Sequence, residues 1–172
     1  MSALAPFLSA VFPALVVIAA LRDATSFTIP NWLCALAVAA FVPVALVCQL
    51  PLIGWAWAGG LFAGFLVAGM AMFAMGWIGG GDAKLFAACG LWLGGTAAVW
   101  PFLAWTAVAG GGMALALLFA RRWAPGFSVR GAPWMARLLT EGESVPYGVA
   151  IAVGALMAFP QSPLMQAISH LG

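Results

Sequence analysis

The chain has 172 residues, of which 66% are hydrophobic and only 6% carry a charged side chain. A soluble domain has about 25% charged residues, so this composition excludes an ordinary soluble fold. The apolar runs lack the alternating polar positions of a membrane barrel, and the net charge of +2 comes without a phosphate-binding basic patch. The sequence therefore predicts an all-α, polytopic membrane protein that lies in the lipid bilayer and binds no nucleic acid.

Six hydrophobic stretches have roughly the length of a membrane span, which needs about 20 residues. The first, Leu4 to Leu21, lacks the basic n-region of a cleaved signal peptide, so we expect a permanent span. The others run from Trp32 to Leu50, from Trp55 to Trp77, from Leu85 to a break at Gly94-Gly95-Thr96, from Ala97 to Ala120, and from Pro146 to Ile168. We interpret residues 1–172 as one membrane domain with a cytoplasmic loop at about 121–145.

The basic residues favour six transmembrane helices over five. With six spans, all of them fall on one side of the membrane, which the positive-inside rule makes cytoplasmic. They are Arg22, Lys84, Arg121, Arg122, Arg130 and Arg137. A single long span over 85–120 breaks this agreement. The six-span arrangement places both chain ends on the opposite side and brings Asp23 and Asp82 to the cytoplasmic face.

Aromatic and cysteine residues are consistent with this arrangement. Indole prefers the membrane interface, and five tryptophans lie near predicted span ends: Trp32, Trp55, Trp57, Trp77 and Trp100. Around Trp134 and Arg137 the sequence fits a short helix on the cytoplasmic surface or a solvated loop equally well. Cys34, Cys48 and Cys89 lie in apolar runs without a CxxC pair, which predicts buried packing and no metal site.

Two acidic residues lie where hydrophobic spans meet water. Asp23 follows the first span, and Asp82 follows three consecutive glycines. A carboxylate at membrane depth costs roughly 2.5–3.5 kcal/mol on insertion scales, so both are candidate functional residues. Two close carboxylates that share a proton can hydrolyse a peptide bond without metal, because one activates water while the other polarises the carbonyl. The alternative for either is a helix cap, and Asp23 could also pair with Arg22.

The three glycines before Asp82 predict a loop. Each glycine costs about 1 kcal/mol relative to alanine in a helix. Irregular backbone at membrane depth is tolerated where it is buried in protein or lines a water-filled cavity. We therefore expect water access beside Asp82 and room for an extended peptide.

The segment Gly79-Gly80-Gly81-Asp82-Ala83-Lys84 resembles the GxGDxK signature of the type IV prepilin peptidases, which are intramembrane aspartyl proteases. Asp23 with Ile29-Pro30-Asn31, and Pro146-Tyr147-Gly148 at the last span, match two further elements of that family in the same order. The resemblance implies that Asp23 and Asp82 are catalytic, that Gly79 and Gly81 shape the loop, and that Lys84 completes the motif. It also implies structural support from Pro30, Asn31, Pro146, Tyr147 and Gly148.

The resemblance further implies that the protein removes the short basic leader of prepilins, just before a hydrophobic helix, at the cytoplasmic face of the bacterial inner membrane. No cofactor is implied. The chain lacks the CxxC-containing domain of longer members and resembles the short form of Flp-type tight-adherence pili, so methylation of the new N-terminus is not expected. Residues 24–28 lack the basic side chains that short-form relatives often carry.

Two other functions compete with the peptidase interpretation. One is a cation- or proton-coupled transporter, which would need a polar path across the membrane, and the spans hold almost no polar residues deep inside. The other is a non-catalytic membrane subunit of a pilus assembly, which the intact glycine–aspartate motif disfavours.

Overall fold

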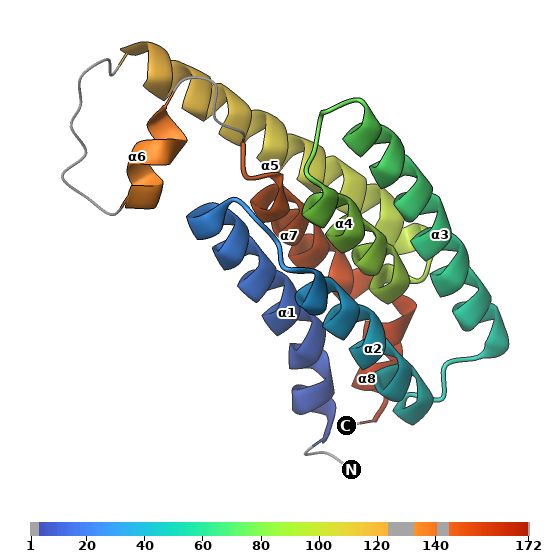
Figure 1. Cartoon of the computed structure of the whole chain (residues 1–172). Helices are drawn as coiled ribbons and strands as arrows, with labels where there is room; N and C mark the ends of the chain where they lie inside the picture. The colour runs from blue at the N-terminus through green and yellow to red at the C-terminus, as the bar shows by residue number, and fades with distance from the viewer. Residues whose placement is uncertain (1–3, 124–132, 141–144, 172) are drawn as a thin grey trace.

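The chain folds as a bundle of helices (Figure 1). The computed structural model describes residues 4–123, 133–140 and 145–171. The helices are α1 (Leu4–Ser26), α2 (Asn31–Val47), α3 (Leu52–Ala74), α4 (Gly80–Leu93), α5 (Thr96–Trp123), α6 (Pro133–Leu139), α7 (Tyr147–Ala158), the 3₁₀ helix η1 (Phe159–Gln161) and α8 (Pro163–Ser169). No strand occurs in these ranges, and the predicted all-α class is confirmed.

Proline and glycine set several helix ends. Pro30 and Pro51 lie in extended backbone immediately before α2 and α3, where the missing N–H of proline costs nothing. Gly94 ends α4 in the left-handed conformation with φ of 52°, which glycine adopts readily. Because α5 begins at Thr96, the predicted break at this point is confirmed and a single span over 85–120 is excluded.

The helices that correspond to the six predicted spans differ in length. By length and composition, α1, α3 and α5 can each cross a membrane, and residues 147–161 with α8, bent by 52°, make a fourth when taken as one span. In contrast, α2 has 17 residues and α4 has 14, shorter than the usual crossing. Thus the predicted order of helical stretches is found, but three or four of them have the length of a full span.

Some predicted boundaries are wrong. Helix α1 continues past Leu21, the predicted end of the first span, to Ser26, and Asp23 lies near its C-terminal end. Helix α5 continues to Trp123, into the segment predicted as a loop. The last stretch is broken, because the hydroxyl of Ser162 accepts a hydrogen bond from the N–H of Met165 and caps α8 as a separate helix.

Aromatic rings fill the core between α1, α2, α4 and the end of α7. Phe12 stacks on Trp92 with ring centroids 5.1 Å apart, while Phe41 and Phe159 contact the same indole. The indole N–H of Trp92 donates to the carbonyl oxygen of Ala37 at 2.8 Å. This bond satisfies a polar group that is completely buried, and it ties α4 to α2.

The outer surface carries many large apolar side chains. Val67 and Met70 on α3, and Trp100 and Leu118 on α5, are all more than half exposed. A contiguous apolar surface of this kind belongs against lipid, so the fold is that of a membrane-embedded protein. The three cysteines, in contrast, are free and buried, as predicted.

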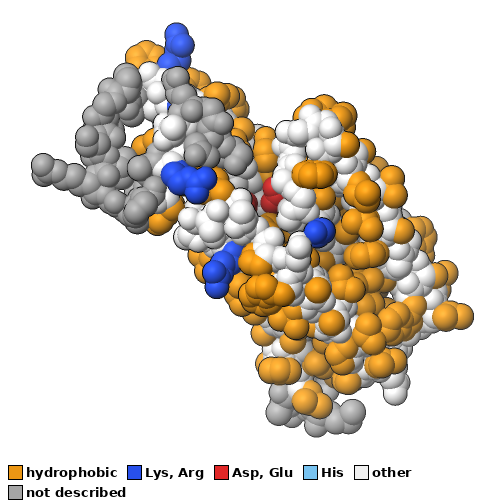
Figure 2. All heavy atoms as spheres, viewed as in Figure 1, with side chains coloured by type: hydrophobic (Ala, Val, Ile, Leu, Met, Phe, Trp, Pro, Cys, Tyr) orange, Lys and Arg blue, Asp and Glu red, His pale blue; other side chains and the backbone are white. Residues whose placement is uncertain are grey.

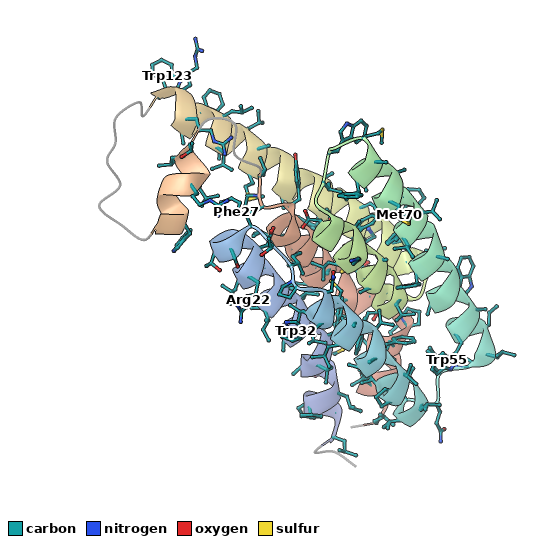
Figure 3. The ribbon with its side chains drawn as sticks, in the orientation of Figure 1. Arg22, Phe27, Trp32, Trp55, Met70 and Trp123 are labelled. Atoms are coloured by element: carbon teal, nitrogen blue, oxygen red, sulfur yellow. The ribbon has the colours of Figure 1, made fainter. Side chains whose placement is uncertain are left out.

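The two ends of the bundle differ. Both chain termini lie at one end, and the connections from α1 to α2 and from α3 to α4 lie toward the other (Figure 1). On the face drawn in Figure 2, the blue basic side chains gather toward that second end. Trp55 and Trp123 lie at opposite ends of the molecule (Figure 3). Arg130 belongs to the predicted basic set but lies outside the described residues.

A short helix, α6, lies beside the C-terminal ends of α1 and α5 (Figure 1). The guanidinium carbon of Arg137 lies 4.6 Å from the ring centroid of Phe27, a cation–π contact between α6 and the α1–α2 connection. Nε of Arg121 donates to the carbonyl oxygen of Leu138 at 3.0 Å. The helix predicted around Trp134 is therefore present, and the solvated-loop alternative is wrong for Pro133–Leu139.

Candidate active site

Asp23 lies on the inner face of α1, near its C-terminal end, and is 4% exposed. Its Oδ2 accepts a hydrogen bond of 2.7 Å from the backbone N–H of Gly148. Gly148 belongs to the first turn of α7, where backbone N–H groups have no partner within the helix and attract a carboxylate. Asp23 thus caps another helix, whereas Arg22, its predicted alternative partner, is exposed.

Asp82 lies in the first turn of α4 and is 7% exposed. Its Oδ2 accepts a hydrogen bond of 3.1 Å from the backbone N–H of Gly79, the residue before the helix. The alternative prediction, that Asp82 caps a helix, therefore accounts for Oδ2. The other oxygen, Oδ1, is buried without a hydrogen-bond partner in the described part of the chain. Such an atom is costly, so it is expected to have a ligand or a chemical role.

The two carboxylates are neighbours. They interact electrostatically with each other, and the N–H of Gly148 lies close to both. Figure 2 shows red carboxylate atoms in a hollow of the surface, and among the described residues only Asp23 and Asp82 carry that colour. A general acid and base must be close together and accessible to substrate, and a buried pair that is open on one side meets both requirements.

Ile29, in the α1–α2 connection, packs against α4, which carries Asp82, and against α7, whose Gly148 binds Asp23. A Cβ at Gly81 would lie 3.0 Å from the carbonyl oxygen of Ile29, and one at Gly148 would lie 2.7 Å from its Cδ1. Glycine at these two positions lets α4 and α7 approach Ile29 closely. The prediction that Gly81 shapes a loop is wrong, because Gly80 and Gly81 lie in the first turn of α4. Gly81 allows close packing instead.

Lys84 lies on the same helix but does not bond to either aspartate. Its Nζ donates to Oδ1 of Asn31 at 2.7 Å, and both side chains are exposed. Asn31 is the first residue of α2, directly after Pro30. This bond ties the start of α2 to the start of α4, so Lys84, Asn31 and Pro30 lie beside the pair rather than in it.

Pro146 and Tyr147 form the entry to α7. Pro146 is buried at the N-cap, and Tyr147 is the first helical residue, half-buried. Together they position the backbone N–H of Gly148 so that it donates a hydrogen bond to Asp23. Among the described residues, no three His, Cys, Asp or Glu side chains lie together in a way that could hold a metal ion.

These features define a helical membrane protein with a buried carboxylate pair. A family model described as the type IV leader peptidase family matches residues 10–121, which contain both aspartates and the glycine motif. The chain therefore belongs to the type IV leader peptidase family, and the predicted family is confirmed. A search of the curated proteins and a search of the solved structures found no match.

Proposed function

We propose that the protein is an aspartic endopeptidase that cleaves the leader from type IV prepilins, with Asp23 and Asp82 as its catalytic residues. The observation that carries this proposal is the buried carboxylate pair held by the N–H groups of Gly148 and Gly79, with Oδ1 of Asp82 left without a partner. Membership of the type IV leader peptidase family supports the peptidase activity.

The pair acts with one proton between its two carboxyl groups, because two adjacent carboxylates do not both ionise readily. The ionised carboxylate takes a proton from a water molecule, whose oxygen attacks the scissile carbonyl carbon. The protonated carboxyl donates a hydrogen bond to the carbonyl oxygen and stabilises the developing negative charge. Breakdown of the tetrahedral intermediate breaks the C–N bond, and a proton from the pair passes to the leaving amine.

The backbone N–H groups at the two helix ends serve this chemistry by positioning. Each N–H donates a hydrogen bond to Oδ2 of one aspartate, so the orientation of each carboxylate is fixed before substrate binds. In this mechanism water or the substrate carbonyl completes the hydrogen bonding of Oδ1 of Asp82, which has no partner in the described part of the chain.

The substrate we propose has a short basic leader, and the cut precedes its hydrophobic helix at the cytoplasmic face of the bacterial inner membrane. The basic residues at the active-site end of the bundle support this orientation. We further propose a Flp-type prepilin as substrate and no methylation of the new N-terminus, in line with the resemblance of the chain to the short form of the family.

The test is cleavage of a Flp-type prepilin that is co-expressed with the wild type, with Asp23→Asn or with Asp82→Asn. We expect the wild type to shorten the prepilin and each variant to lose at least roughly 100-fold in rate, since each removes a general acid or base. Blotting of the membrane fraction controls for insertion. Normal cleavage by either variant would contradict the two-aspartate mechanism, and no cleavage of several prepilins by inserted wild type would favour a non-catalytic role.

A further inference from the structure

A cavity of about 450 Å³ lies between the α3–α4 and α5–α7 helix pairs. Its walls include Trp77 and Ile78 from the α3–α4 connection, Phe86 from α4, Gly110 and Gly111 from α5, and Tyr147 from α7. Volumes of this size are typical of sites that bind a small molecule or several side chains.

Two residues of the cavity wall are sequence neighbours of the glycines that bind the aspartates. Ile78 directly precedes Gly79, whose N–H binds Asp82, and Tyr147 directly precedes Gly148, whose N–H binds Asp23. Consecutive Cα atoms are about 3.8 Å apart, so each wall begins one peptide unit from the group that holds a carboxylate. A guest in the cavity therefore contacts residues that directly precede the two groups holding the carboxylates.

The lining of the cavity selects an apolar guest. None of its lining residues carries a charge, and the polar side chains among them are those of Thr106 and Tyr147. Trp77 and Gly111 are exposed, so the cavity opens on the outer, lipid-facing surface. The exposed Lys84 lines a different groove together with Asn31 and α2, and a basic leader would avoid that side.

We propose that this cavity binds the apolar side chains that follow the scissile bond, and that the prepilin's hydrophobic helix docks here from the bilayer. The inference rests on the proposed peptidase function and deepens it. The basic leader then lies toward the acidic pair while the apolar segment stays in the cavity, so charge and hydrophobicity together fix which bond reaches Asp23 and Asp82.

Two adjacent glycines of α5 provide a matched test. A Cβ at Gly111 or at Gly112 meets no atom within 4 Å, so both positions accept a side chain without disturbing the fold. Gly111 lines the cavity, whereas Gly112 does not. Leucine at either position gains the same helix propensity, so any difference between Gly111→Leu and Gly112→Leu reports on filling of the cavity.

In membranes that contain the full-length protein, we expect Gly111→Leu to lower kcat/KM for prepilin by roughly tenfold or more, since it displaces apolar contacts of the substrate. Gly112→Leu is expected to stay within about twofold of the wild type. Equal rates for the two variants, with cleavage by the wild type intact, would overturn the cavity proposal and leave the proposed function standing.

A binding readout separates docking from catalysis. Gly111→Cys is placed in the Asp23→Asn, Asp82→Asn background and treated with a short bis-maleimide and a prepilin that carries one cysteine in the first turns of its helix. We expect a cross-link that Gly112→Cys does not give.

Absence of the Gly111→Cys cross-link would overturn the inference, and a lipid acyl chain would then be the better occupant. Failure of the wild type to cut any prepilin would overturn the proposed function and this inference with it.

Discussion

At the scale of single residues, Gly148 leaves no room for a side chain beside Asp23. A Cβ there would lie 2.8 Å from Oδ2 of Asp23 and 2.7 Å from Cδ1 of Ile29, closer than real Cβ contacts. We expect Gly148→Ala to displace the carboxylate and to lower the rate of prepilin cleavage by roughly 100-fold, because a shift of about 1 Å misaligns the reacting groups. The rate is measured in membranes that contain equal amounts of each protein.

The control for this prediction is Gly112→Ala, whose Cβ meets no atom within 4 Å. It changes the same residue type in a helix and is expected to cleave at the wild-type rate. If Gly148→Ala also cleaved normally, the space beside Asp23 would accept a Cβ, and the close fit at Gly148 would not be needed for activity.

The aspartates could be predicted from the sequence because a charged side chain in an apolar chain is expensive and conspicuous. The groups that hold them are less visible. Gly148 lies 125 positions from Asp23 and contributes a backbone N–H, which every residue except proline has. Only the resemblance of Pro146-Tyr147-Gly148 to a family element pointed there. The unpartnered Oδ1 of Asp82 depends on packing around it, which no local pattern encodes.

At the scale of elements, the start of α4 shows why a loop was predicted and a helix is found. The helical cost of consecutive glycines is real, at about 1 kcal/mol each. Two contacts stabilise the helix and offset this cost. They are the hydrogen bond from the N–H of Gly79 to Asp82 and the close contact of Gly81 with Ile29. Both are tertiary or terminal effects, so a count of propensities alone leads to the wrong element.

This explanation predicts opposite effects for two neighbouring glycines. A Cβ at Gly80 would lie 3.6 Å from the Phe73 ring, an ordinary contact, whereas one at Gly81 would lie 3.0 Å from Cβ and from the carbonyl oxygen of Ile29. We expect Gly80→Ala to stabilise the protein by up to about 1 kcal/mol and Gly81→Ala to destabilise it despite the same gain in propensity. Thermal unfolding in detergent micelles measures both.

Equal stabilisation by the two substitutions would show that the first turn of α4 can move away from Ile29 at no cost. The close approach would then be incidental to the fold, and the packing role assigned to Gly81 would be wrong. Cleavage rates of the same variants separate stability from activity, because of these two glycines only Gly81 packs closely against Ile29, in the connection that follows the helix of Asp23.

At the scale of the whole molecule, hydrophobic runs and charges predicted the order of the helices and the break at Gly94. They did not predict their lengths. Pro30 and Pro51 bracket α2, and a left-handed Gly94 cuts α4 short, so two of the helices fall below the length of a full span. Hydropathy is summed over side chains and does not register where the backbone turns. The predicted first span therefore stops at Leu21, whereas α1 continues to Ser26 and includes Asp23.

The orientation of the bundle in the membrane can be tested at its two ends. Thr28 is exposed in the α1–α2 connection, and Ser169 is exposed in α8 at the end that holds both termini, while the described cysteines are buried. Because basic residues mark the cytoplasmic side, an impermeant maleimide should label Ser169→Cys in intact spheroplasts and Thr28→Cys only after permeabilisation. The reverse pattern would leave the carboxylate chemistry intact but place it on the far side of the membrane from a cytoplasmic leader. The proposed substrate would then be wrong, and a peptide presented from outside would have to replace it.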